Sequence, residues 1–138
     1  MIGLDTNVLL RCFVDIDDPA QAQRAQAQRV RAFVASRCTR DDPGHVDRVT
    51  LCEMIWVLAR GYRYPKAEIA RILDALLDRE NLVLEDADCV AAALRIFRTS
   101  GVDFADALIG RVNQARGCET TATFDRGAAK LEGFVRVA

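Results

Sequence analysis

The chain has 138 residues, of which 51% are hydrophobic and 28% are charged, and its 19 basic and 20 acidic residues leave a net charge of −1. These values exclude an intrinsically disordered chain and indicate a globular protein that is long enough to bury a core. A net charge so close to zero says little about binding partners.

Five cysteines are spread along the chain without a Cys-x-x-Cys pair or a Cys/His ligand spacing. Neither a zinc site nor a disulfide framework is predicted, and buried thiols in a reducing compartment fit better. The sequence has no basic segment followed by an apolar signal region, and no apolar run of membrane-spanning length. We therefore expect a cytoplasmic protein that does not insert into a membrane.

The first half of the sequence predicts two strands and four helices. Asp5 ends an apolar strand over residues 1–4 and precedes the first helix, which reaches about residue 15. Carboxylates and proline over residues 17–19 favour the N-terminus of a second helix. The turn over residues 40–44 precedes a second strand. The remaining predicted bounds are 17–37 for the second helix, 46–49 for the second strand, and 51–60 and 66–79 for a helical hairpin.

In the second half, helices are predicted over 87–98 and 103–116, with a short helix from residue 126. Strands are predicted over 82–84, 120–124 and 134–137. Strands that alternate with helices predict an α/β fold with a mainly parallel central sheet of about four or five strands flanked by helices. No linker-like stretch or internal repeat divides the chain, so residues 1–138 are expected to form a single domain.

Acidic residues occur at four places where a predicted strand gives way to a helix. They are Asp5, Glu53, the pair Asp103 and Asp106, and Asp125. In an open α/β sheet, ligands bind beyond the carboxyl ends of the strands, so residues that are distant in sequence can meet there. Carboxylates that meet repel one another unless a cation joins them, so the pattern indicates a divalent metal site.

Each acid also has a purely structural explanation. Thr50 and Glu53 have the spacing of a capping box. Asp103 suits the N-cap of a helix, and Asp106 suits its first turn, where the helix dipole favours a carboxylate. Asp5 and Asp125 can end a strand or cap the helix that follows. Capping alone therefore remains an alternative for every one of these positions.

The surroundings of two of the acids favour the metal-site interpretation. Glu53 lies in the stretch 51–58, which is apolar on all sides and is therefore expected to be buried, and Asp106 precedes Ala-Leu-Ile. No basic residue lies close to either acid in the sequence, although a buried carboxylate needs a partner. Mg²⁺ or Mn²⁺ would supply that partner, because both are hard ions that prefer oxygen ligands.

Four segments together resemble the PIN-domain ribonucleases, and specifically the VapC-type toxins of VapBC toxin–antitoxin systems. They are Ile-Gly-Leu-Asp-Thr-Asn-Val-Leu over 2–9, Glu53 within 50–58, Asp-Phe-Ala-Asp-Ala-Leu-Ile over 103–109, and Thr-Phe-Asp over 123–125. They occur in the order and spacing of that family. No single segment is specific, but the combination is.

The resemblance implies a catalytic acidic quartet around Mg²⁺ or Mn²⁺, formed by Asp5, Glu53, Asp106 and Asp125. Asp106 matches the acid that precedes the Ala-Leu-Ile run. Asp103 is an extra acid found in only some members; it contacts the ion through water or only caps its helix. The family also has small polar residues that do not bind the ion but orient the carboxylates and water. In this chain they correspond to Thr6, Asn7 and Thr123.

The expected reaction is hydrolysis of an RNA phosphodiester bond by water that the ion activates, without a covalent enzyme intermediate. The resemblance also implies a homodimer that is inhibited by a cognate antitoxin. Two alternatives remain. A phosphatase with an aspartate nucleophile would need a second acid two residues after the first, where this chain has Asn7. A catalytically silent interaction module would keep the fold without a metal.

The second predicted helix carries Arg24, Arg29, Arg31 and Arg37. These side chains either follow an RNA backbone or form a solvated helix face, and the second explanation is the more common one.

Overall fold

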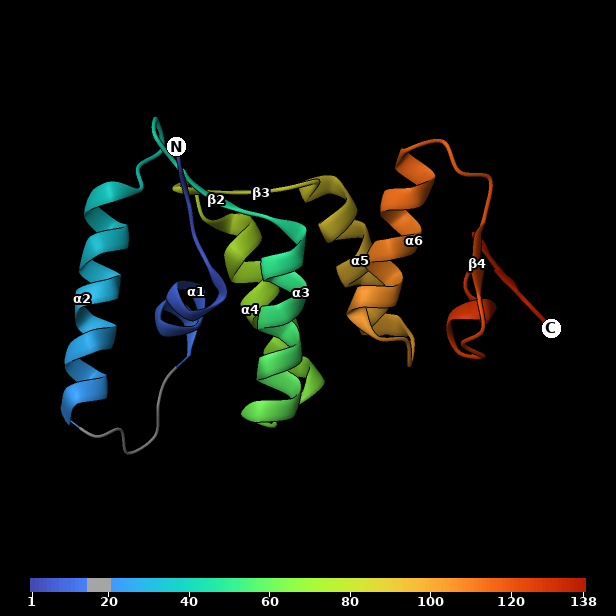
Figure 1. Ribbon diagram of the computed structural model, residues 1–138, viewed down its shortest axis with the longest axis horizontal. Coiled ribbons are helices and arrows are strands. Elements are labelled where there is room, and N and C mark those ends of the chain that lie inside the picture. Colours follow the sequence, from blue (N-terminus) through green and yellow to red (C-terminus); the bar gives the residue numbers. More distant parts are fainter. Residues whose placement is uncertain (15–20) are drawn as a thin grey trace. The chain divides into compact units, whose positions relative to one another are not determined.

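The computed structural model describes residues 1–14 and 21–138, which form two compact units, Met1–Glu85 and Asp86–Ala138. Figure 1 colours the first unit from blue to yellow and the second from dark yellow to red. The start of the second helix that the sequence places at residues 17–19 lies outside the described residues.

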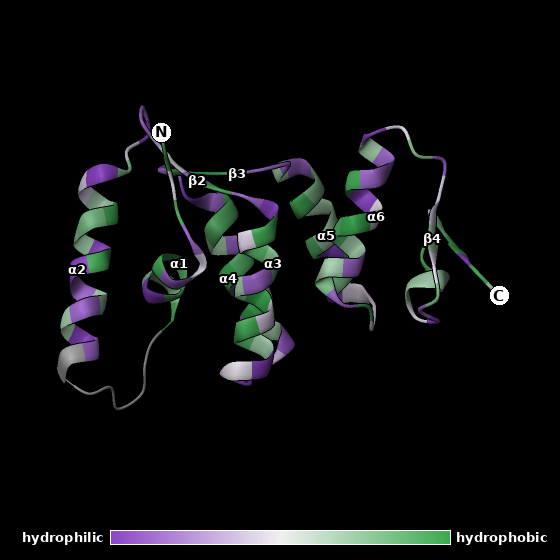
Figure 2. Cartoon of the chain, in the orientation of Figure 1, coloured by the Kyte–Doolittle hydropathy of each residue, from purple (hydrophilic) through white to green (hydrophobic). Residues whose placement is uncertain are grey.

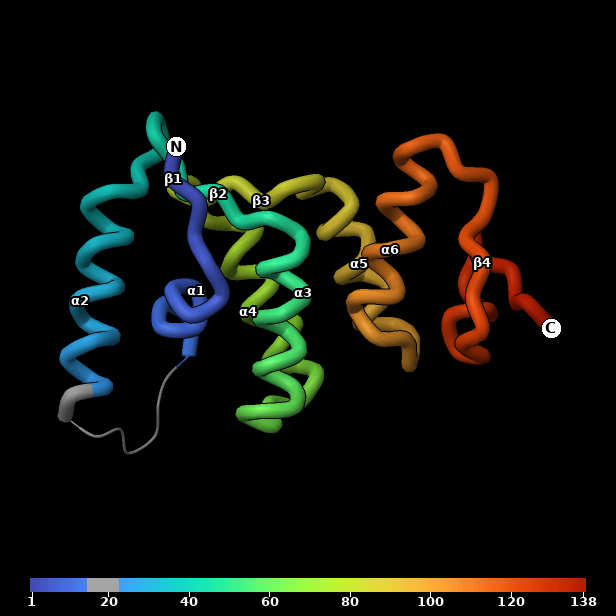
Figure 3. The backbone as a smooth tube through the Cα atoms, in the orientation of Figure 1, coloured from blue at the N-terminus to red at the C-terminus, as the bar shows by residue number. Residues whose placement is uncertain are grey.

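The first unit contains a parallel sheet of three strands in the order β1-β2-β3 (Figure 3). Its elements are β1 (Ile2–Gly3), α1 (Thr6–Phe13), α2 (Gln21–Arg37), β2 (Gly44–Val46), α3 (Arg48–Trp56), the π-helical turn η1 (Val57–Gly61), α4 (Lys66–Asp78) and β3 (Leu82–Leu84). Ile2 pairs with Gly44, and His45 pairs with Val83. Parallel neighbours need a long crossover connection, which α1 and α2 provide for the first pair and α3 and α4 for the second.

The core of this unit is made of aliphatic side chains from several elements. α1 packs against both α2 and α3, and α4 packs against β3. The fully buried side chains include Leu9, Leu51, Leu58, Leu73 and Leu76. Gly44 lies at the centre of the sheet, where an added Cβ would come within 2.9 Å of Cys38 Sγ and of Leu4 Cδ1. Packing at Gly44 is therefore as tight as the chain allows.

α2 is attached to α1 mainly through polar side chains, and hydrophilic residues extend along it in Figure 2. Arg11 Nε donates to Gln26 Oε1 at 2.9 Å, and Arg31 Nε donates to the carbonyl oxygen of Arg11 at 3.0 Å. Val34 is buried near the C-terminal end of the helix. The first half of α2 lacks an apolar stripe in the sequence, and its described side chains are exposed or half-buried.

The second unit contains a helical pair and a parallel pair of strands, β4 with β5. Its elements are α5 (Ala87–Thr99), α6 (Phe104–Ala115), β4 (Thr121–Thr123), the 3₁₀ turn η2 (Ala128–Lys130) and β5 (Phe134–Arg136). α5 packs along α6, and the rings of Phe97 and Phe104 meet edge to face at 6.1 Å. Val90, Leu94 and Leu108 are buried in the same core.

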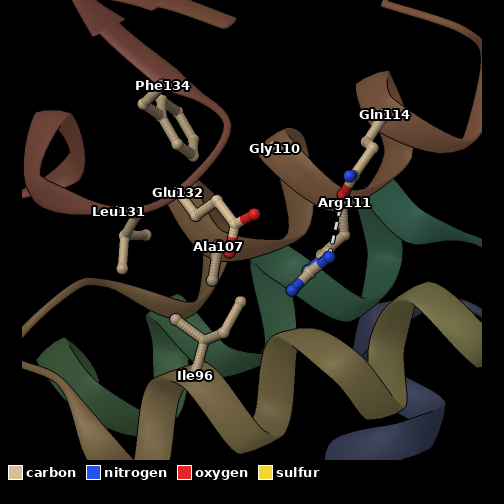
Figure 4. Close-up of a pocket in the computed structure, with 8 residues that line it drawn as sticks. All are labelled: Ile96, Ala107, Gly110, Arg111, Gln114, Leu131, Glu132 and Phe134. Carbon is tan, nitrogen blue, oxygen red and sulfur yellow. Dashed lines mark hydrogen bonds between the residues drawn. The ribbon is translucent and has the colours of Figure 1, made fainter. Parts of the chain in front are cut away.

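α6 contacts the strand pair through residues spaced three to four apart on one helix face. An added Cβ on Gly110 would come within 2.4 Å of the Phe134 ring, so only glycine lets β5 approach this closely (Figure 4). One turn later, Asn113 Nδ2 donates to Thr121 Oγ1 at 3.0 Å. These two contacts join α6 to β5 and to β4, and β4 is the strand that leads to Asp125.

The predicted α/β class is confirmed, and every strand pair is parallel. The five strands found in the described residues are divided into sheets of three and two, whereas the sequence analysis expected one central sheet. The second strand covers Gly44–Val46 instead of 46–49, because Asp47 already caps α3. No helix in the described ranges is long and apolar enough to cross a bilayer.

All five cysteines are free. Cys38 is buried, as expected, but Cys118 is exposed and the other three are half-buried.

Candidate metal centre

Two of the candidate acids lie at the N-terminus of α6. Asp103 is the N-cap residue, with φ −60° and ψ 144°, but its side chain makes no capping hydrogen bond. Asp106 is in the first helical turn, three residues later. Residues at this spacing lie on the same side of a helix. The start of α6 therefore presents two carboxylates that do not serve as caps.

Asp125 follows β4, and two hydrogen bonds hold its backbone N–H and one oxygen of its side chain. Its backbone N–H donates to Thr123 Oγ1 at 3.0 Å, and its Oδ1 accepts from the backbone N–H of Ala128 at 2.7 Å. The capping explanation is thus correct for one of its two oxygens. The other oxygen has no hydrogen-bond partner within the described ranges. Capping fixes the carboxylate in place and still leaves an oxygen for a ligand.

The three acids of the second unit come together at this point. Partial burial raises the pKa of Asp106 above its ordinary value, and the negative charges of Asp125 and Asp103 raise it further. No basic side chain in the described part of the chain forms an ion pair or a hydrogen bond with Asp106. Among the described residues, this cluster of like charges therefore has no compensating basic side chain.

The donor chemistry of the cluster fits a hard divalent cation. All donors are carboxylate oxygens, which Mg²⁺ and Mn²⁺ prefer. Among the described residues, no three Asp, Glu, His or Cys side chains are already gathered at metal-ligand spacing. Mg²⁺ does not need such a set, because it usually keeps several waters and binds directly to one or two carboxylates.

In the first unit, Asp5 is the N-cap residue of α1, with φ −88° and ψ 174°. Its Oδ1 accepts from the backbone N–H of Val8 at 3.1 Å, and the side chain is exposed. Thr6 is buried at the start of the helix, whereas Asn7 is exposed. Asp5 therefore resembles Asp125, because one oxygen caps a turn and the other has no hydrogen-bond partner in the described ranges.

The structure corrects both expectations for Glu53. The side chain is exposed, although the sequence predicted burial, because only part of the apolar stretch faces the core: Leu51 and Met54 are buried, whereas Trp56 is 62% exposed. The capping-box explanation is also wrong. The N-cap of α3 is Asp47, which accepts from the backbone N–H and the hydroxyl of Thr50 at 2.8 Å each.

Glu53 consequently lies inside α3 without a capping role. Its side chain forms no hydrogen bond or ion pair with any described residue. Asp5 and Glu53 belong to the first unit, and the cluster of Asp103, Asp106 and Asp125 belongs to the second.

Two of the four arginines of α2 have structural roles. Arg31 donates to the carbonyl oxygens of Arg11 and Val14 and so caps the C-terminus of α1, and Arg37 forms an ion pair with Asp42 at 2.6 Å. The arginine that sequence reasoning missed is Arg11, which lies next to the candidate acid of α1. Arg11 lies four residues after Asn7, and two residues at this spacing lie on the same helix face. This spacing was the feature of the sequence that could have identified Arg11.

The chain belongs to the PIN domain family, whose sequence pattern matches residues 2–133. PIN domains are typically Mg²⁺-dependent nucleases that act on RNA, and they often pair with antitoxins. Searches of curated proteins and of solved structures give no match.

Proposed function

We propose that this chain is a Mg²⁺- or Mn²⁺-dependent ribonuclease that hydrolyses RNA phosphodiester bonds, with Asp5, Glu53, Asp106 and Asp125 as its acidic quartet. The observation that carries the proposal is the cluster of carboxylates at the start of α6, where the pKa of Asp106 is raised and no basic side chain of the described ranges compensates the charge. Membership of the PIN domain family supports it.

Some of these residues are proposed ligands of the ion, and others hold those ligands in position. Asp106 and Asp125 would hold the ion from the second unit, and Asp5 and Glu53 would complete the set within a single domain over residues 1–138. Thr123 fixes Asp125 by accepting its backbone N–H, while Thr6 and Asn7 begin the helix that Asp5 caps. When bound, the divalent ion supplies the positive charge that activates water and stabilises the charge developing on the phosphoryl oxygens.

The direct test compares cleavage of a labelled single-stranded RNA by the wild type and by Asp5→Asn, Glu53→Gln, Asp106→Asn and Asp125→Asn variants, over a titration with Mn²⁺. We expect loss of cleavage in each variant with retention of the fold. Retained activity in one variant would remove that residue from the quartet. A wild type that neither binds Mn²⁺ nor cleaves RNA would reject the nuclease and favour a silent interaction module.

The phosphatase alternative makes a separate prediction. An aspartate nucleophile would form a phosphoenzyme that acid quenching can trap, whereas hydrolysis by activated water forms none. The amide of Asn7, at the position where the phosphatase needs its second acid, argues against this alternative.

We further propose a cytoplasmic toxin that forms a homodimer and is inhibited by a cognate antitoxin. Large apolar side chains that lie on the surface support a protein partner: Trp56 is 62% exposed, Phe124 78% and Phe33 50%. Expression of the chain alone should arrest growth, and co-expression with the neighbouring small open reading frame should restore it. Normal growth together with a monomer in light scattering would reject the toxin and leave the nuclease proposal standing.

A further inference from the structure

The first unit has an open groove of about 240 Å³ between α1 and α2. Its lining residues are Asp5, Asn7, Val8, Arg11, Gln26 and Val30. The groove thus contains one candidate metal ligand and one arginine. No ion pair joins Asp5 to Arg11, and neither side chain forms an ion pair with another described residue.

The guanidinium of Arg11 is held in a fixed position. Its Nε donates to Gln26 Oε1 at 2.9 Å, and its Nη1 donates to the backbone carbonyl of Asn7 at 3.1 Å. Because Asn7 lies one turn earlier, the side chain extends back along α1 toward the N-terminus that Asp5 caps. The charged group is therefore brought toward the candidate acid on the surface of the groove.

Much of the hydrogen-bonding capacity of Arg11 is unused within the described ranges. A guanidinium has five N–H donors, and the two bonds to Gln26 and Asn7 use only two of them. The remaining donors, on Nη1 and Nη2, form a planar set that matches two oxygens of a phosphate. A guanidinium that two hydrogen bonds already orient loses less entropy on binding than a mobile surface arginine.

The composition of the groove favours a nucleic-acid backbone over a protein segment. Four of its six lining residues are polar or charged, and the apolar contribution is limited to Val8 and Val30. A peptide would need an apolar or aromatic pocket to anchor it. A phosphate needs a positive donor fork, which Arg11 provides.

We propose that Arg11 is a positioning residue that binds a backbone phosphate of single-stranded RNA next to the linkage to be cleaved, with Gln26 orienting its guanidinium. This inference rests on the proposed ribonuclease function. Contacts to phosphate fix the register of a nucleic acid without reading its bases. The contact is therefore independent of sequence.

The test measures binding of a labelled single-stranded RNA to Arg11→Gln in a cleavage-silent Asp106→Asn background, over a series of salt concentrations. Loss of a charge-assisted contact should raise the Kd about tenfold or more. It should also reduce the slope of log Kd against log salt by about 0.7, the value for one phosphate contact on a single strand. Arg71→Gln on α4, where Arg71 pairs with Glu68 on the surface, is the matched control and should change neither quantity.

Two further variants separate positioning from a structural role. Gln26→Ala keeps the charge and removes its orientation, so KM for cleavage should rise with little change in the salt slope. Arg11→Lys keeps the charge and loses the fork, so binding should be intermediate. Melting temperatures close to that of the wild type show that the variants fold, and an Arg11 that only ties α1 to α2 would change stability without changing the salt slope.

The outcomes are distinct. If the wild type cleaves RNA and Arg11→Gln keeps its Kd and its salt slope, the phosphate site is wrong and the nuclease stands. A variant that binds RNA normally but changes its oligomeric state in light scattering would show that the groove is a protein interface, which also overturns the inference. A wild type that neither binds nor cleaves RNA rejects both proposals.

Discussion

The N-termini of α3 and α6 have the same layout and opposite electrostatics. Each helix has an aspartate at the N-cap, Asp47 in α3 and Asp103 in α6. Three residues later α3 has Thr50, which donates two hydrogen bonds to its cap, whereas α6 has a second acid, Asp106. The pKa of Asp47 is lowered by the bonds from Thr50, while the pKa of Asp106 is raised by burial and by its acidic neighbours.

The comparison shows what distinguishes a capping acid from a candidate ligand. The negative charge of Asp47 is stabilised by donors of its own helix, which leaves little for an external ion. At α6 the corresponding donor is replaced by another acceptor, so the helix start lacks a side-chain cap and presents carboxylates that are candidate ligands for a cation. Two helices that both have an aspartate at the N-cap can therefore differ in the chemistry of their N-termini, and not only in stability.

The largest effect is expected from Asp106→Thr, which recreates the α3 arrangement at the start of α6. Cleavage should fall by roughly 10²–10³-fold, the range seen when one charge-stabilising group is removed from an active site. The melting temperature should rise, because repulsion disappears and a capping bond worth about 1 kcal/mol can form. Nuclease assays and thermal melts on the same preparations check both effects.

The sign of the pH dependence follows from the raised pKa of Asp106. A carboxyl whose folded pKa is raised binds protons more readily in the folded state, so the wild type loses stability as pH rises through that pKa. The stability difference between Asp106→Thr and the wild type should therefore shrink as pH is lowered. A difference that is constant with pH would mean that charge repulsion is not its cause.

Asp103→Asn should be milder than Asp106→Asn. Asp103 is exposed and makes no capping bond, so the asparagine variant should retain much more activity and Mn²⁺ affinity than the Asp106 variant. Isothermal titration with Mn²⁺ alongside the cleavage assay gives the ranking. The reverse order would identify Asp103 as the ligand, and equal severe losses would indicate a shared site.

Glycine-to-alanine changes compare packing in the two units. Gly44→Ala should destabilise the protein by about 1–3 kcal/mol through overpacking, since its Cβ would lie 2.9 Å from both Cys38 Sγ and Leu4 Cδ1. Gly110→Ala should cost less, because the Phe134 ring can shift, but that shift should displace the strand pair and lower cleavage. Denaturant unfolding measures the first effect and the nuclease assay the second.

Gly3→Ala is the matched control for stability, because an added Cβ there has no neighbour within 4 Å. A loss of stability equal to that of Gly44→Ala would show that glycine removal itself, and not packing, is responsible.

The smallest effect distinguishes the two caps. Asp47→Ala should cost about 1 kcal/mol, the usual value for an N-cap aspartate, whereas Asp103→Ala should cost almost nothing because no capping bond is lost. The pKa of Asp47 is lowered by its bonds from Thr50, so its contribution is complete above the ordinary aspartate value of about 3.9 and disappears as pH falls through the lowered pKa. Urea unfolding at pH 7 and at acidic pH tests this, and equal costs for the two variants would contradict the comparison.

Elements with strong local signals were predicted well from the sequence. The strand at Leu82–Leu84 and the helix that begins at Lys66 were placed correctly, because apolar period and flanking turns agree there. The sequence analysis placed the start of α3 wrongly, because Thr50 resembles an N-cap residue in the sequence. The true N-cap is Asp47, whose side chain accepts the backbone N–H of Thr50, and only the structure shows this hydrogen bond.

For the candidate site, the sequence identified the acids but not their environments. The burial of Glu53 was predicted wrongly because a helix that is apolar on all sides does not reveal which face meets the core, and here Val49 and Trp56 are exposed. The role of Gly110 was also hidden in the sequence, because it depends on contact with Phe134, which is 24 residues away along the chain. Such long-range contacts need three-dimensional information.

The contact of Phe134 with Gly110 has a consequence for protein synthesis. Asp103 and Asp106 are synthesised well before residues 134–136, yet β4, the strand that leads to Asp125, pairs with β5. A nascent chain that stops before Phe134 therefore carries the candidate acids without the strand pair that precedes and follows Asp125. The proposed nuclease would therefore become active only after residues 134–136 have been synthesised and have paired with β4.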